Sequence, residues 1–211
     1  VGHPLLDVLN ENIKQNLKRE KLIALLPGSR DQEISKILPV MLSVTKYFKK
    51  YQFTICAAPS KTKSYYEKFI KVYNCENVNI VENQTYNVLS RSSAALVASG
   101  TATLEAALIK TPQIVCYKSS WISILIGKFL LRNIKFISLV NLILNKSAVK
   151  ELIQSDLSTK NILKELEVIL SEDGKKKIIE YYNELENLLN KKGASRETAK
   201  KIIKYHLDSN S

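Results

Sequence analysis

Short apolar runs alternate with helix-like segments along most of this 211-residue chain, and this alternation restricts the fold more than any single motif does. The runs have the length of strands and occupy residues 22–26, 53–57, 78–81, 94–98 and 113–117. Segments of helical spacing begin between them, near Asp31, Pro59, Thr85 and Thr101. Apolar strands joined by helices form right-handed βαβ units. We therefore predict an α/β fold, a Rossmann-like parallel sheet with helices on both faces.

The last part of the chain has a different pattern. Helical spacing recurs at 159–170, 174–189 and 195–207 with no apolar strand between these segments. We expect a Rossmann-like domain at 1–170 and a helical extension at 171–211 that packs on this domain or on a partner domain. The chain begins with Val1 and a Gly-His-Pro turn, which is typical of the interior of a longer protein.

Two strand-to-helix connections share one design. We call LIALLPGSRDQEI, at 22–34, the first joint and ALVASGTATLEAAL, at 95–108, the second joint. In each, a turn of small residues separates an apolar run from a helix start, where unpaired N–H groups and the helix dipole attract anions. Ligands of open α/β sheets bind at the carboxyl ends of the strands. The pair of joints therefore predicts a site for a phosphate-bearing ligand.

The first joint carries a turn glycine, Gly28, followed by Ser29 and Arg30. The glycine permits a tight turn, the hydroxyl could cap the helix or contact phosphate, and the guanidinium fork suits a diphosphate. A plain capped turn in which Arg30 pairs with Glu33 is the alternative. The motif is neither a Walker A sequence nor GxGxxG.

The second joint offers hydroxyl and backbone N–H groups from Ser99, Gly100, Thr101 and Thr103. Glu105 lies one helical turn beyond Thr101 on the same face. A carboxylate repels phosphate but accepts hydrogen bonds from the vicinal hydroxyls of a ribose. The alternative is an acid that offsets the helix dipole.

Three further polar residues follow later in the chain. Asn141 comes after an apolar run and could bond a ligand or cap the next segment. Glu151 and Gln154 share one side of a short expected helix. His3 has no identifiable partner, and its use as a general base stays a guess.

Composition excludes some functions. Two histidines and no clustered ligands disfavour a metal site, and three cysteines without CxxC spacing indicate buried thiols. A net charge of +12 would suit nucleic acid, an anionic membrane or a polyphosphate ligand, but equally a solvated lysine-rich surface. No nucleic-acid-binding motif is present.

The most apolar stretch, WISILIGKFLLRNIKFISLVNLIL at 121–144, is interrupted by Lys128, Arg132 and Lys135. These three share a helix face, and each would cost about 3 kcal/mol at a bilayer centre. An amphipathic helix followed by a strand at 136–139 fits better than a membrane span. The stretch could lie on an anionic membrane, pack against the core or form a subunit interface.

The order of the motifs GHPLLD, LLPGSRDQEI, SGTATLEAAL, TPQIVCYK, FISLVNLI and VKELIQ resembles the C-terminal half of lipid-A-disaccharide synthases. The resemblance runs over 1–170 and continues, less specifically, through GASRETAKKII. It implies the C-terminal domain of a GT-B glycosyltransferase of family 19. Members of this family transfer 2,3-diacylglucosamine from UDP to 2,3-diacylglucosamine 1-phosphate (lipid X) in lipid A biosynthesis, without cofactor or metal.

Carried over by motif, Ser29 and Arg30 would contact the UDP diphosphate, and Glu105 the ribose. The other donor-site positions would be Ser99, Gly100, Thr101, Thr103, Asn141, Glu151 and Gln154. The resemblance places the acceptor site and the catalytic residues in an N-terminal domain that we expect this chain to lack. It also implies a cytoplasmic enzyme, peripheral on the inner membrane of a Gram-negative bacterium. A UDP-sugar epimerase, a non-catalytic UDP-sugar-binding module on the same scaffold and a homodimer all stay open.

Overall fold

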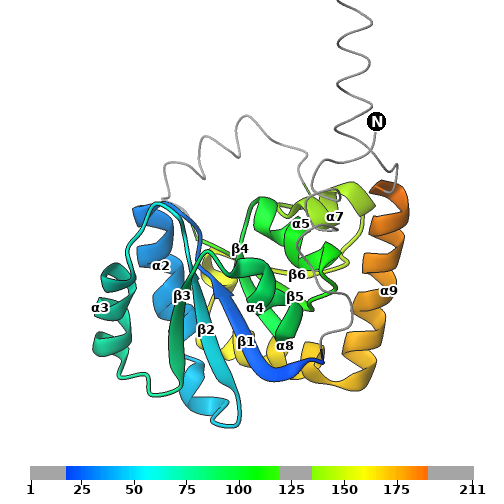
Figure 1. Ribbon diagram of the computed structural model, residues 1–211. Helices are drawn as coiled ribbons and strands as arrows, with labels where there is room; N and C mark the ends of the chain where they lie inside the picture. Colours follow the sequence, from blue (N-terminus) through cyan, green and yellow to red (C-terminus); the bar gives the residue numbers. More distant parts are fainter. Residues whose placement is uncertain (1–17, 119–134, 190–211) are drawn as a thin grey trace, which may run out of the picture.

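The computed structural model describes residues 18–118 and 135–189, and in these ranges it has a single parallel sheet with strand order β3-β2-β1-β4-β5-β6 (Figure 1). The strands are β1 (Glu20–Leu26), β2 (Gln52–Ala57), β3 (Val78–Glu82), β4 (Ser92–Ala98), β5 (Gln113–Tyr117) and β6 (Lys150–Ile153). The predicted α/β class with a Rossmann-like parallel sheet is confirmed.

Helices connect the strands and follow the last one. The α-helices are α2 (Asp31–Leu42), α3 (Lys63–Tyr73), α4 (Thr85–Arg91), α5 (Thr101–Leu108), α7 (Leu139–Leu144), α8 (Thr159–Leu170) and α9 (Glu172–Leu189). Short 3-10 helices occupy Thr45–Tyr47 and Gln154–Asp156. The sequence places the start of α3 a few residues early, because Pro59 and Ser60 form a turn before the N-cap residue Thr62.

The central strands β1, β2, β4 and β5 are largely buried on both faces, which explains why they are mostly apolar. Along β1, Ile23 and Leu25 point into one core, while Leu22, Ala24 and Leu26 point into another. The first core is filled by side chains of α2, α3, α7, α8 and α9, and the second by those of α4, while α5 contributes to both. Each fully buried Leu or Ile contributes about 1.5–3 kcal/mol to this packing.

The order of the strands contains one reversal of direction. From β1 the chain adds β2 and then β3 on one side, and it then returns to place β4 directly beside β1. From β4 it adds β5 and β6 on the other side. The connections leaving β1 and β4 therefore diverge, and the carboxyl ends of these two strands flank the topological switch point.

The region after residue 135 differs from the prediction in two ways. The expected strand at 136–139 is wrong, because Ser138 is the N-cap of α7 and its hydroxyl accepts the Asn141 N–H. The expected short helix around Glu151 is also wrong. Residues Lys150–Ile153 pair in parallel with β5, and Leu152 is buried opposite Cys116. Glu151 therefore lies on an edge strand, and Gln154 begins the 3-10 helix that follows.

The C-terminal helix α9 is part of the same core. It packs on α5, α7 and α8, and Figure 1 shows one end of it beside α5 and α7. Its buried Tyr182 hydroxyl accepts a hydrogen bond from Gln113 at 3.2 Å and donates to the Thr111 carbonyl, also at 3.2 Å. This helix therefore completes the packing around β5.

Some predictions fall outside the described residues: the amphipathic helix within 121–134, the helix at 195–207 and any role of His3. Within 18–118 and 135–189, none of the helices combines the length and apolar character that crossing a membrane requires.

Candidate functional site

A cavity of about 320 Å³ lies at the carboxyl ends of β1, β2 and β4. It is lined by residues that follow these strands or begin the next helices: Leu26, Gly28, Ser29, Glu33, Cys56, Ala57, Ala58, Pro59, Thr85, Ala98, Ser99, Gly100, Thr101, Ala102 and Glu105. The structure thus brings the first joint and the second joint to one cavity. Of the predicted site residues, Ser29, Ser99, Gly100, Thr101 and Glu105 line it.

In the first joint, a carboxylate of the helix itself occupies the turn. Gly28 has a φ of 98°, and a Cβ at this position would come within 2.0 Å of the Glu33 Oε2 atom. That oxygen accepts the Ser29 N–H at 3.3 Å. The Glu33 carboxylate therefore sits on the backbone turn at the start of α2, where only a glycine leaves room for it.

Arg30 is the N-cap residue of α2, and its side chain is exposed and outside the cavity lining. Its carbonyl accepts the Glu33 and Ile34 N–H groups at 3.0 and 2.9 Å, which starts the helix. The alternative of an Arg30–Glu33 ion pair is not what the structure has, because Glu33 turns back to the Ser29 backbone.

The loop after β2 braces the first joint. Lys61 pairs with Asp31 in the first turn of α2, with 2.8 Å between Nζ and Oδ2, and lies over the Tyr65 ring. The hydrogen bond from Lys61 lowers the pKa of Asp31. The Ser60 hydroxyl also reaches the Ser29 carbonyl at 3.4 Å. These contacts fix the turn of the first joint from the outside.

The second joint is open as far as the described residues are concerned. Gly100, the N-cap residue of α5, has a φ of 143°, and a Cβ added there would meet no atom of residues 18–118 and 135–189 within 4 Å. Thr101 is exposed at the first position of α5. The Ser99 hydroxyl donates to the Ile137 carbonyl at 3.3 Å, which ties this joint to the segment before α7.

Thr103 supports the second joint from inside the core and is not accessible to a ligand. Its side chain is fully buried, and its hydroxyl donates to the Gly100 carbonyl at 2.8 Å. Its own carbonyl accepts the Gln113 amide at 2.8 Å. The residue therefore holds the turn of the second joint but does not line the cavity.

Glu105 is partly buried in the wall of the cavity. The Tyr86 hydroxyl donates to its Oε1 atom at 3.4 Å. Burial raises the pKa of Glu105, and the hydrogen bond from Tyr86 opposes that rise. Nearby, burial raises the pKa of the Cys56 thiol to about 12, so this wall residue is an inert thiol at neutral pH.

Asn141 and Glu151 form a buried network behind the second joint. The Asn141 amide donates to the Val149 carbonyl and to Glu151 Oε1, and its oxygen accepts the Ala148 and Val149 N–H groups, all at 2.9 Å. Glu151 in addition accepts the N–H groups of Ile137 and Ser138. Both side chains thus orient the backbone around α7.

Gln154 stands apart from the cavity. It has a positive φ of 55°, and its Nε2 atom is buried without a hydrogen-bond partner among the described residues. Arg30, Thr103, Asn141, Glu151 and Gln154 are thus the predicted residues that the structure does not place in the lining.

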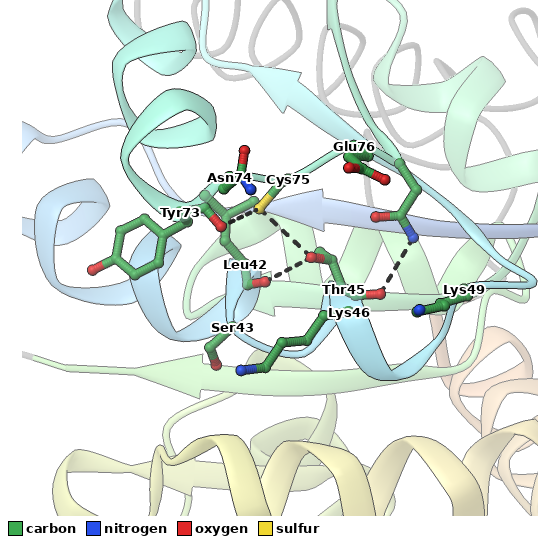
Figure 2. Close-up of a pocket in the computed structure, with 10 residues that line it drawn as sticks. Leu42, Ser43, Thr45, Lys46, Lys49, Tyr73, Asn74, Cys75 and Glu76 are labelled. Carbon is green, nitrogen blue, oxygen red and sulfur yellow. Dashed lines mark hydrogen bonds between the residues drawn. The ribbon is translucent and has the colours of Figure 1, made fainter.

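A second, larger cavity of about 700 Å³ lies at the opposite end of the sheet, where β2 and β3 begin (Figure 2). Figure 2 shows Thr45 and Cys75 facing each other, 3.6 Å between Oγ1 and Sγ. Helices α2 and α3 end at this cavity, so their negative dipole ends account for the nearby Lys46 and Lys49. No strand-to-helix joint opens into it, and it is therefore the weaker candidate for an anion site.

In the described ranges, no group of three or more His, Cys, Asp or Glu side chains is arranged to hold a metal ion. The chemistry available in the smaller cavity is instead hydroxyl and backbone N–H donors from two joints and two carboxylates.

Comparison with known proteins adds the family. The family model described as lipid-A-disaccharide synthetase matches residues 1–204. The chain belongs to the lipid-A-disaccharide synthase family. It is 37% identical over 205 residues to the lipid-A-disaccharide synthase of Syntrophus aciditrophicus, a match that covers 92% of this chain and 53% of that protein. For the synthase of Francisella tularensis subsp. novicida the identity is 35% over 179 residues, covering 79% and 47%. The chain thus spans about half the length of the curated relatives it matches.

Solved structures that resemble this member of the lipid-A-disaccharide synthase family have low sequence identity and indicate the fold alone. The UDP co-structure of S. aureus MnaA has a TM-score of 0.65 at 12% identity and covers 98% of this chain and 54% of its own. The UDP-GlcNAc 2-epimerase of Neisseria meningitidis, bound to UDP-GlcNAc, has a TM-score of 0.53 at 18% identity, covering 95% and 48%. A UDP complex of an S. aureus TarM mutant has a TM-score of 0.58 at 15% identity, covering 94% and 41%.

Sequence reasoning missed three contributors to the site in this family member. The sequence suggests Glu33 only as a partner of Arg30, although its i+4 spacing from Ser29 puts it within reach of the turn. Thr85 and Tyr86, at the start of α4, approach the second joint only through the tertiary fold. These contacts depend on the strand order, which places β4 beside β1. No local sequence pattern shows that order.

Proposed function

We propose that this chain is the nucleotide-sugar-binding half of a lipid-A-disaccharide synthase. The donor would be UDP-2,3-diacylglucosamine, and the acceptor would be 2,3-diacylglucosamine 1-phosphate (lipid X). The observation that carries the proposal is the cavity at the switch point, to which both joints contribute. Family membership and the UDP ligands named for structures of the same fold support it.

In this proposal, each joint has a separate task. Ser29 and Arg30 would bind the diphosphate, since an exposed guanidinium beside a helix start provides a permanent charge and directed donors. Ser99, Gly100 and Thr101 would line the phosphate and sugar side. Glu105 would accept hydrogen bonds from the ribose hydroxyls.

Most of the remaining predicted residues would act indirectly. Thr103 holds the Gly100 turn, and the pair Asn141 and Glu151 holds the segment that bonds Ser99. We retain Gln154 as a donor-site candidate because its buried amide is aligned with no described acceptor.

The proposed reaction is displacement at the anomeric carbon of the donor with inversion, with UDP as the leaving group. Arg30 and the two helix starts would stabilise the charge that builds on the diphosphate. The base that takes the acceptor proton and the acceptor site itself would come from the half of the relatives that lies outside the match.

We also propose that the protein works as a peripheral enzyme on the cytoplasmic side of the inner membrane, through the basic apolar stretch at 121–144. The described end of this stretch is consistent with that role: Leu142 and Ile143 on α7 are exposed at 44% and 37%. Flotation with anionic liposomes at low salt tests it, and recovery of all the protein in the soluble fraction would retire it.

The donor-site proposal is tested by calorimetric titration with UDP, with AMP as the competing nucleotide. We expect UDP to bind with a Kd below the millimolar range and AMP to bind more weakly. Arg30→Ala should weaken UDP about ten- to hundredfold, the loss of a charge-assisted hydrogen bond. Arg91→Ala is the matched control, because Arg91 pairs with Glu20 at the other end of the sheet. Equal affinity of Arg30→Ala and the unaltered chain would contradict the proposal.

The epimerase alternative predicts a different product. A chain of that kind would convert UDP-GlcNAc to its C2 epimer without any acceptor. The family match is to a synthetase, so we expect no such conversion, and NMR of UDP-GlcNAc incubated with the protein distinguishes the two. A binding module without catalysis would bind UDP but give no product when the other half of a synthase is supplied.

A further inference from the structure

The Glu33 carboxylate lies on the backbone turn at the start of α2, and a helix start is the kind of place where anions bind. Its Oε2 atom accepts the Ser29 N–H at 3.3 Å and lies against Gly28, where a Cβ would come within 2.0 Å of it. It also sits in the lining of the 320 Å³ cavity. A carboxylate with these contacts uses the same N–H group and the same positive helix end that attract phosphate.

The other acid of this helix start is placed differently. Asp31 in the first turn is turned outward to Lys61, with 2.8 Å between its Oδ2 atom and Nζ. In the described part of the chain the second joint has no equivalent of Glu33, since none of these residues comes within 4 Å of a Cβ placed on Gly100. Of the carboxylates near the two joints, only Glu33 is seated on the turn itself in the described part of the chain.

We propose that Glu33 is an internal anion that closes the first joint until a diphosphate displaces it. The inference rests on the proposed function, because it regulates that same site. Two anions do not share one set of N–H donors, so the diphosphate and the Glu33 carboxylate compete. The apparent affinity for ligand then falls by the fraction of molecules in which the joint is open.

The structure also shows how Glu33 can leave. Its side chain is only partly buried, and the Ser29 N–H is its one hydrogen-bond partner in the described ranges. The turn at Gly28 is also supported by the loop after β2, because the Ser60 hydroxyl donates to the Ser29 carbonyl. Departure of the carboxylate therefore frees the donors without dismantling the turn.

The test compares the whole chain with its Glu33→Gln variant by calorimetric titration with UDP, inorganic pyrophosphate and uridine. The amide removes the charge but keeps an acceptor for the Ser29 N–H, so the fold is retained. We expect UDP and pyrophosphate to bind about two- to tenfold tighter to the variant, as expected when one like charge leaves a helix start. Uridine, which has no phosphate, should bind equally to both.

Two further variants make the result specific. Glu67→Gln removes the same charge from the exposed face of α3 and should leave all affinities unchanged. Glu33→Ala removes the acceptor as well as the charge, so it should tighten binding at least as much as Glu33→Gln, and it serves if the amide variant is unstable. Unchanged or weaker pyrophosphate binding by both Glu33 variants would overturn the inference.

The outcomes also separate this inference from the function it rests on. If UDP fails to bind the unaltered chain and both variants while pyrophosphate binds the variants more tightly, the internal anion stands and the UDP-sugar site falls. If UDP binds the unaltered chain and the Glu33 variants with one affinity, the donor site stands and the internal anion falls.

Discussion

The first joint and the second joint look alike in sequence, but they differ in what fills them. Each follows an apolar strand and places a positive-φ glycine before a helix, with φ values of 98° at Gly28 and 143° at Gly100. At Gly28 the Glu33 carboxylate covers the turn, whereas no atom of the residues that the structure describes lies within 4 Å of a Cβ placed on Gly100. One joint is closed by its own helix, and the other is left open by residues 18–118 and 135–189.

The two joints are also held in place differently. The first is braced by exposed polar contacts from the loop after β2, with Lys61 paired to Asp31. The second is braced from behind by a buried network, in which Glu151 holds the segment whose Ile137 carbonyl bonds Ser99. Buried networks are costly to break, while exposed ion pairs contribute little. We therefore expect the support of the second joint to be harder to break than that of the first.

The largest expected effect comes from breaking the support of the second joint. Asn141→Ala removes two donated and two accepted hydrogen bonds and leaves the buried Val149 N–H group unpaired, while the Ala148 N–H keeps only its bond to the Lys146 carbonyl. We expect the free energy of unfolding to fall by about 2–4 kcal/mol, measured by urea denaturation. Asn79→Ala, at an exposed position of β3, is the control. A loss of less than about 0.5 kcal/mol would show that the network is not a support.

The next effect compares the glycines directly. Alanine at either position adopts an unfavourable positive φ, at a cost of about 1–3 kcal/mol. At Gly28 the new methyl group must also expel Glu33, so Gly28→Ala should be the more destabilising variant in thermal unfolding. A double-mutant cycle sharpens this: Glu33→Ala should partly rescue Gly28→Ala but add independently to Gly100→Ala. Additivity at both glycines would mean that Glu33 does not occupy the first joint.

Glu105→Gln should separate stability from binding in the second joint. Burial raises the folded-state pKa of Glu105 above its unfolded value, so its stabilising protonated form is lost as the pH rises through the folded pKa. Glutamine has no such loss. At pH 8 we expect the variant to unfold about 1–2 °C higher than the unaltered chain, a difference that should vanish below about pH 4.

The same variant should bind UDP about tenfold more weakly if Glu105 accepts the ribose hydroxyls as a charged group. Melting curves at both pH values and one UDP titration suffice. A lower melting temperature at pH 8 would mean that the hydrogen bond from Tyr86 outweighs the burial of the charge.

The smallest effect is expected at the brace of the first joint. The hydrogen bond from Lys61 lowers the pKa of Asp31, so its stabilising contribution is present at neutral pH and is lost as the pH falls through the folded pKa. Because the pair is exposed, Asp31→Asn should shift the melting temperature by less than about 1 °C at physiological salt. A larger shift that persists at 1 M salt would show that this brace is as rigid as the buried network.

The two joints could be predicted from the sequence, whereas other parts of the fold could not. The joints were predicted because each combines an apolar run, a glycine turn and a helix start within one short segment. Strand β6 was missed because its sequence, KELI, buries only Leu152 and owes its conformation to pairing with β5. Pairing partners are a property of the fold and leave no local pattern at an edge strand.

The site shows the same division. Local sequence predicts a glycine turn before a helix start, because few other residues adopt that backbone conformation. This pattern is enough to predict the cavity-lining positions Gly28, Ser29, Gly100 and Thr101. The role of Asn141 could not, since an amide after an apolar run suits either a ligand or a backbone loop, and only the neighbouring Val149 and Glu151 decide between them. The sequence shows that Glu33 has the spacing to reach the turn. Whether it bonds the Ser29 N–H or pairs with Arg30 depends on the backbone conformation of the turn.

The packing of α9 affects when the protein can fold during its synthesis. A ribosome releases β5 long before Tyr182, whose hydroxyl bonds both Gln113 and the Thr111 carbonyl. Until that tyrosine has been synthesised, the Gln113 amide and one side of the core stay exposed to water. We therefore expect the nascent chain to hold its sheet only loosely, and to become resistant to proteases as a single step once α9 has left the exit tunnel.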